Sequence, residues 1–98
     1  MNDNNNKNIT EFNYAQKQRL AFIDFLLMFK GSFSRNDLTT KFEMGMANAT
    51  RDIALYRELA PKNSEFNNPT KTYNQAKSFK SLFEYDARKT LVKLANNI

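Results

Sequence analysis

The sequence predicts a mainly α-helical domain with a small β-hairpin. Its 98 residues suffice for one domain and no more. Apolar residues recur at helical spacing in the first sixty positions, and Pro61 ends this pattern. Two short alternating stretches joined by a polar turn follow, which is typical of a hairpin, and a further helical pattern occupies the end of the chain.

The composition excludes several classes of chemistry. The chain has no Cys and no His, so disulfide frameworks, zinc fingers, thiol catalysis and imidazole acid–base chemistry are excluded. We expect no membrane span, because the most apolar stretch is too short, and no secretory signal at the polar N-terminus. The net charge is +5, and an isoelectric point of about 9.6 is typical of a nucleic-acid-binding domain.

The first predicted helix covers about residues 15–30. Leu20, Ile23 and Leu27 recur on one face, and Gly31 suits the left-handed position that ends a helix. Between Leu20 and residue 29, however, apolar side chains surround almost the whole circumference, so every side of this helix needs cover. Core packing and a dimer surface would each meet that need.

A short second helix is predicted over about residues 35–43. Ser34 is a good N-cap, and Asp37 is an acidic residue in the first turn, where the helix dipole favours it. Leu38 and Phe42 form the apolar pair of this helix.

The third predicted helix covers about residues 48–59, after a tight turn with Gly45 as its hinge. Apolar residues at i, i+4 and i+7 give it one buried face, formed by Ala49, Ile53 and Tyr56. Its start is poorly capped by Ala47, unless Asn48 takes that place. Two short helices joined by a turn containing Gly are typical of a helix-turn-helix.

Residues 64–67 and 71–74 form the predicted hairpin, with Phe66 and Tyr73 on its inner face. The segment after it carries three expected anchors to the core, Phe79, Leu82 and Phe83. A last helix is expected from about Asp86, with one face formed by Ala87, Leu91 and Leu94.

The order helix, helix-turn-helix, hairpin, helix is that of a winged helix-turn-helix followed by a C-terminal helix. We expect a polar, flexible N-terminal tail over 1–13, the winged helix-turn-helix domain over 14–83, and a C-terminal linker or dimerisation helix over 84–98. Within the domain, the recognition helix is expected at about 48–59 and the wing at about 64–74.

Several pieces of the sequence occur in the order found in a known family. They are QKQRLAFID (16–24), FKG (29–31), RNDL (35–38) with Phe42, ATRDIALYRELAP (49–61), KTY (71–73) and FKSLF (79–83). In this order they resemble the N-terminal winged helix-turn-helix of WYL-domain transcriptional regulators, in particular the repressors found beside bacterial phage-defence systems such as BREX and CBASS. The similarity extends from about Tyr14 to Phe83.

The resemblance implies a repressor of a phage-defence operon that binds double-stranded DNA as a homodimer, in the bacterial cytoplasm at the nucleoid. In this family a WYL domain and a further C-terminal domain follow the winged helix and sense a ligand. The chain ends at Ile98, where they would begin, so we expect an N-terminal part of a longer protein rather than a stand-alone relative. Within this chain we expect no small-molecule ligand, no cofactor and no metal.

The first turns of the predicted recognition helix carry the candidate base contacts. They are Asn48, Thr50 and Arg51. Arg binds guanine O6 and N7 through two parallel bonds, and Asn does the same for adenine N6 and N7. Thr suits a phosphate or the thymine methyl group. On an ordinary amphipathic helix the same residues would simply form the solvated face.

Two further places are candidate phosphate contacts. Ser34 and Arg35 lie at the start of the second helix, where backbone N–H groups attract anions. Thr70 and Lys71 lie at the tip of the hairpin, where Lys71 would add affinity without sequence preference.

Two neighbouring residues have structural interpretations. Asp52 would be repelled by phosphates, so we expect it to turn sideways and pair with a basic residue such as Arg35 or Arg57. Tyr56 is expected in the core rather than on DNA.

Two other functions compete with DNA binding. A winged-helix module that binds protein would use the apolar first helix and show no salt-dependent affinity for duplex DNA. An enzyme is not expected, because the carboxylates lack ligand spacing and no phosphate-cradling Gly loop is present. A homodimer on an inverted repeat is expected, through the first helix or the apolar face of the last one.

Overall fold

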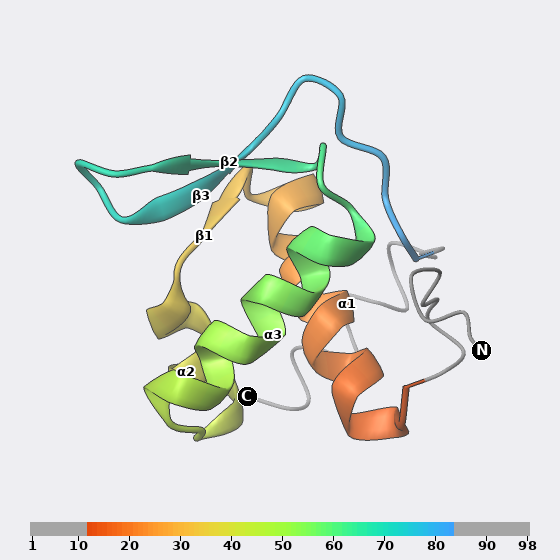
Figure 1. The fold of residues 1–98 in the computed structure, drawn as a ribbon, viewed down its shortest axis with the longest axis vertical. Coiled ribbons are helices and arrows are strands. Elements are labelled where there is room, and N and C mark those ends of the chain that lie inside the picture. The colour runs from red at the N-terminus through yellow and green to blue at the C-terminus, as the bar shows by residue number, and fades with distance from the viewer. Residues whose placement is uncertain (1–11, 84–98) are drawn as a thin grey trace.

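The computed structural model describes residues 12–83 as three helices and a three-stranded antiparallel sheet (Figure 1). The predicted last helix and most of the predicted N-terminal tail lie outside the described residues. The elements are α1 (Tyr14–Phe29), β1 (Ser32–Phe33), α2 (Arg35–Phe42), α3 (Met46–Leu59), β2 (Ser64–Asn67) and β3 (Thr72–Gln75). The strand order is β1-β3-β2. This is a winged helix, as the sequence predicts.

Helix α1 has a side-chain cap at its beginning and a glycine at its end. The Asn13 side chain accepts from the Gln16 N–H at 2.8 Å, and the Gln16 side chain accepts from the Asn13 N–H at 3.1 Å, which is a capping box that the sequence reading missed. At the other end the N–H groups of Lys30 and Gly31 both bond the Leu26 carbonyl at 2.9 Å. Gly31 has φ +89°, so its predicted left-handed role is confirmed.

The start of α2 agrees with the prediction, whereas the turn after it does not. Ser34 is the N-cap of α2, and its N–H donates to the Asp37 carboxylate at 2.8 Å. The left-handed residue of the turn is Glu43, with φ 51°, and not Gly45. Gly45 is instead the extended N-cap of α3, and its carbonyl accepts from the Ala49 N–H at 3.1 Å.

Helix α3 therefore begins at Met46, two residues before the predicted start. Ala47 and Asn48 lie inside its first turn, so neither caps it. The cause is that Gly suits an N-cap as well as a hinge. The other end is as predicted: α3 ends at Leu59, and Ala60 before Pro61 is its C-cap.

The sheet contains one strand that the sequence reading missed. Phe33 of β1 pairs with Tyr73 of β3, and Tyr73 pairs on its other side with Phe66 of β2. The Phe33 and Tyr73 rings stack with centroids 4.9 Å apart. Phe66 lies on the same inner face, as predicted, with its ring 4.8 Å from that of Tyr73, but it is 43% exposed. The reason is that the hairpin projects past the helices that cover the rest of this face (Figure 1).

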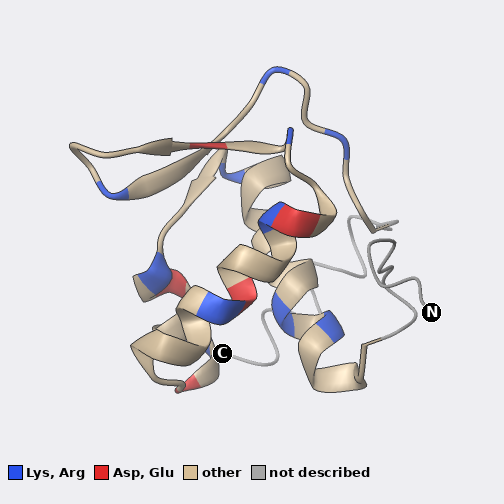
Figure 2. Ribbon diagram, in the orientation of Figure 1, with Lys and Arg blue, Asp and Glu red and all other residues tan. Residues whose placement is uncertain are grey.

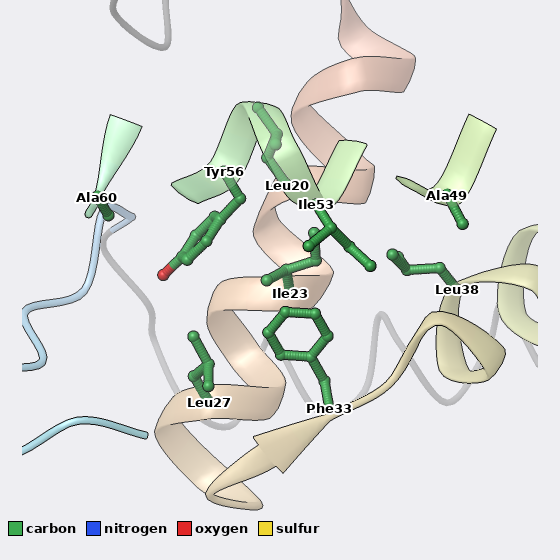
Figure 3. Packing of buried hydrophobic residues seen from close by; sticks show 9 residues of the cluster. All are labelled: Leu20, Ile23, Leu27, Phe33, Leu38, Ala49, Ile53, Tyr56 and Ala60. Carbon is green, nitrogen blue, oxygen red and sulfur yellow. The ribbon is translucent and has the colours of Figure 1, made fainter. Parts of the chain in front are cut away.

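The core lies where α1, α2, α3 and β1 meet (Figure 3). Its buried members are Leu20, Ile23, Leu27, Phe33, Leu38, Ala49, Ile53, Tyr56 and Ala60. The predicted apolar faces of the three helices are thus confirmed. The predicted anchors Phe79, Leu82 and Phe83 also pack against this core. On the outer side of α1, the rings of Phe25 and Phe29 lie 4.8 Å apart, and Phe29 is half exposed.

A buried polar network ties the segment after β3 to the helices. Asp24 of α1 is fully buried and accepts from the Tyr56 hydroxyl of α3 at 2.5 Å, from the Ser81 hydroxyl at 2.6 Å and from the Leu82 N–H at 3.2 Å. Burial raises the pKa of the Tyr56 phenol well above its ordinary value, and the hydrogen bond to Asp24 raises it further. Asp24 therefore fixes both α3 and residues 81–82 relative to α1.

Asn63 extends this network into the loop after α3. Its side-chain amide donates to the Tyr56 hydroxyl at 3.0 Å and to the Lys80 carbonyl at 2.7 Å, and its side-chain oxygen accepts from the Lys80 N–H at 2.9 Å. The loop and the segment after β3 are thereby held together at the C-terminal end of α3.

Candidate nucleic-acid interface

The first turns of α3 present polar side chains to solvent. Asn48, Thr50 and Arg51 are all exposed, whereas Ala49 and Ile53 on the opposite face are buried in the core. Arg51 donates to the Asn48 side-chain oxygen at 3.0 Å. The packing of α3 thus fixes its rotation, and the three predicted base contacts point away from the body of the domain.

The start of α2 lies beside these turns. Arg35 is exposed and donates through Nη1 to the Thr50 hydroxyl at 3.1 Å. Ser34 is partly buried, and its N–H and hydroxyl both lie within hydrogen-bond distance of the Asp37 carboxylate, at 2.8 and 3.4 Å. Of the two predicted phosphate contacts at this helix start, Arg35 is the one that reaches solvent beside α3.

Asp52 has a partner that the sequence reading did not name. It is 7% exposed, and its carboxylate binds Arg19 Nε of α1 at 2.6 Å. The predicted pairing of Asp52 with a basic residue is therefore confirmed, but its partner is neither of the two suggested residues, Arg35 and Arg57. Arg35 instead reaches Thr50, and Arg57 lies over the Tyr73 ring at 5.4 Å from its centroid.

One sequence signal could have pointed to Arg19. Gln16 and Arg19 lie three residues apart on α1, next to the stripe formed by Leu20, Ile23 and Leu27. Residues four apart share a helix face, so Gln16 and Arg19, one turn before Leu20 and Ile23, face the same neighbour as this stripe. Here that neighbour is the beginning of α3.

The tip of the hairpin carries the remaining predicted residues. Thr70 and Lys71 are exposed, and the Thr70 hydroxyl lies 2.7 Å from that of Thr72. Lys71 is left-handed, with φ 58°, and its ammonium donates to the Asn68 side chain at 2.7 Å. Figure 2 shows positive residues at the hairpin tip, at the start of α2 and on the first half of α3. Apart from the partly buried Ser34, the predicted site residues thus form two exposed groups, one around α3 and one on the wing.

Neither a metal-binding cluster nor a membrane-spanning helix is found in residues 12–83. No group of three acidic residues in this part of the chain is placed to hold a metal ion. None of the described helices is long and apolar enough to cross a membrane.

Comparisons with known proteins agree with the winged-helix fold. The family model of the BrxR transcriptional regulator winged helix-turn-helix domain matches residues 15–96. The chain is 35% identical over 74 residues to a Pseudomonas aeruginosa protein named DNA-binding transcriptional repressor CapW. This alignment covers 76% of this chain and 25% of the relative. It is 33% identical over 70 residues to the Escherichia coli protein of that name, covering 71% of this chain and 23% of the relative. The chain thus spans about a quarter of the length of these relatives.

Proposed function

The chain belongs to the BrxR family of winged helix-turn-helix regulator domains, and from this premise we propose that it is a sequence-specific, double-stranded-DNA-binding transcriptional repressor. Its relatives carry the name DNA-binding transcriptional repressor. As a repressor it would act on the chromosome, in the bacterial cytoplasm at the nucleoid. The operon it controls would be one for phage defence.

The observation that carries the proposal is the exposed face at the start of α3. A helix in the major groove contacts bases with side chains from its N-terminal turns. Asn48 and Arg51 have the geometry for bidentate contacts to adenine and guanine, and both are exposed there. Their mutual hydrogen bond of 3.0 Å would align the guanidinium before it meets a base.

The residues around this face would position the duplex rather than select its sequence. Arg35 and Thr50 would meet a phosphate at the edge of the groove, with Ser34 beside them, and Thr70 and Lys71 would meet the backbone or the minor groove from the wing. Contacts of this kind supply affinity that depends on salt and not on sequence. The positive residues of these groups (Figure 2) suit that role.

We further propose that two copies bind an inverted repeat. One small module contacts only a few base pairs, so a homodimer gains both affinity and specificity. The outer side of α1, with half-exposed Phe29 beside Phe25, is one candidate contact between the copies, and residues 84–98 are the other. An inverted repeat with half-sites about 34–36 Å apart, or a multiple of this, is expected.

The test is selection of bound duplexes from a random pool, followed by titration of the selected duplex and a scrambled one at several salt concentrations. The proposal predicts an enriched inverted repeat, tighter binding to it than to the scrambled duplex, and affinity that falls as salt rises. A correctly folded chain without salt-dependent duplex affinity would favour the alternative, a winged-helix module that binds protein.

A further inference from the structure

A hollow of about 320 Å³ lies between the first turns of α1 and α3, with Phe42 of α2 and Met44 as its apolar lining. Its polar lining comes from Gln16 and Arg19 of α1 and from Asn48, Arg51 and Asp52 of α3. Three of these five residues, Gln16, Arg19 and Asp52, are not among the residues predicted to contact bases or phosphates. The hollow therefore extends the exposed face of α3 sideways onto a second helix.

The charges around the hollow favour an anion. Two guanidinium groups, those of Arg19 and Arg51, line it together with a single carboxylate. That carboxylate, Asp52, is already bound to Arg19 through Nε at 2.6 Å. Arg51 bonds a neutral partner, the side-chain oxygen of Asn48. The net charge of the lining is thus positive.

Arg19 is held in a fixed position with part of its donor capacity still available. Within residues 12–83 its ion pair uses Nε alone, and its side chain is 25% exposed against 9% for Asp52. Guanidinium carries five N–H donors in a planar fork. Asp52 therefore orients the fork through one donor, and the terminal nitrogens are left to meet a ligand.

We propose that this hollow binds a phosphate group of the DNA backbone, beside the base pairs contacted by α3. Arg19 is the principal contact, Gln16 adds a neutral donor, and Asp52 is a positioning residue that acts through Arg19. A phosphate fits better than a base edge, because the hollow flanks the exposed face of α3 and the major groove is bordered by phosphates. This inference rests on the proposed DNA-binding function.

Salt titration of the chain on its selected duplex tests the proposal. Losing one phosphate contact lowers the magnitude of the salt slope by about 1, so Arg19→Ala should weaken binding about fivefold to tenfold at 0.1 M salt. The loss should be equal on selected and scrambled duplexes. Lys17→Ala is the matched control, because it removes one positive charge from the same helix outside the hollow and should change the slope much less.

Repeating Arg19→Ala in a chain that also carries Asp52→Asn distinguishes two roles of Arg19. It either contacts the phosphate directly or only neutralises the Asp52 carboxylate. If Arg19 contacts phosphate, Arg19→Ala still lowers the slope by about 1 in that background. If Arg19 only shields the DNA from the carboxylate, the loss disappears and the proposal is overturned. Far-UV circular dichroism establishes that each variant is folded before its slope is compared.

Methylphosphonate substitution locates the contact on the DNA. When the phosphates are neutralised one at a time, one position in each half-site should weaken DNA binding by wild type. Neutralising the same phosphate should not weaken DNA binding by Arg19→Ala any further. The absence of such a position, or an unchanged slope for Arg19→Ala while wild type still binds, overturns this inference alone. A folded wild type that binds no duplex overturns the proposed function and this inference together.

Discussion

Replacing Tyr56 by Phe removes one oxygen atom from the core, and we expect this to destabilise the domain by about 2 kcal/mol. The phenol donates to the buried Asp24 carboxylate at 2.5 Å, and a hydrogen bond to a charged group contributes about 1.5–3 kcal/mol. The lower half of this range applies, because Asp24 keeps the Ser81 hydroxyl and the Leu82 N–H as donors. The Asn63 amide also loses its bond to the phenol but keeps the Lys80 carbonyl as acceptor. The phenyl ring of the variant still fills the core, so no large cavity adds to the effect.

Urea unfolding followed by far-UV circular dichroism measures this effect, since the chain has no Trp. The midpoint should fall while the m value stays constant, and the thermal midpoint should drop by about 8–16 °C. Tyr73→Phe is the matched control, because the Tyr73 hydroxyl makes no hydrogen bond within residues 12–83, and it should change stability by less than about 0.5 kcal/mol. Equal stabilities for the two variants would refute the role given to the Asp24 network.

Three further outcomes follow from the same structure. The pKa of Tyr56 is raised in the folded state, so the phenol contributes fully to stability below its unfolded pKa of about 10. Above that pH, the difference in unfolding free energy between wild type and Tyr56→Phe should shrink by about 1.4 kcal/mol per pH unit. A difference that grows with pH in urea melts would contradict this. Lys71→Ala should weaken binding to all duplexes alike and lower the salt slope by about 1, whereas a loss confined to the selected duplex would count against a backbone contact. Gly31→Ala should destabilise the domain by about 1–2 kcal/mol. The cost is backbone strain at φ +89° and not a clash, because a Cβ at this position would meet nothing within 4 Å. Unchanged stability in urea would show that the backbone relieves this strain.

The elements that the sequence predicted correctly are those with local signals. Gly31 ends α1, Ser34 and Asp37 begin α2, and Pro61 follows the end of α3. Each of these signals acts through its own backbone or a residue within one turn, so no knowledge of the tertiary structure is needed. Gly45 shows the limit of such signals, since glycine suits both a hinge and an N-cap and only the surrounding chain decides between them.

The features that the sequence did not reveal depend on residues far apart in the chain. Arg19 and Asp52 are separated by 33 positions, and Asp24 and Ser81 by 57. Strand β1 has only two residues, too few for any alternation, and it exists because Phe33 pairs with Tyr73. The exposed face of α3 was predictable from its apolar period. The spacing of Gln16 and Arg19 indicates only that they face a neighbouring helix, and not that this helix is α3 or that Asp52 is the partner.

Repeating the random-pool selection with Arg51→Ala shows whether the start of α3 contacts base edges in the major groove. We expect this variant to lose its preference at one base pair in each half-site, a loss of about 1–3 kcal/mol, and to keep the preferences at the other positions. An unchanged selected sequence, or an equal loss of affinity for every duplex, would contradict this expectation.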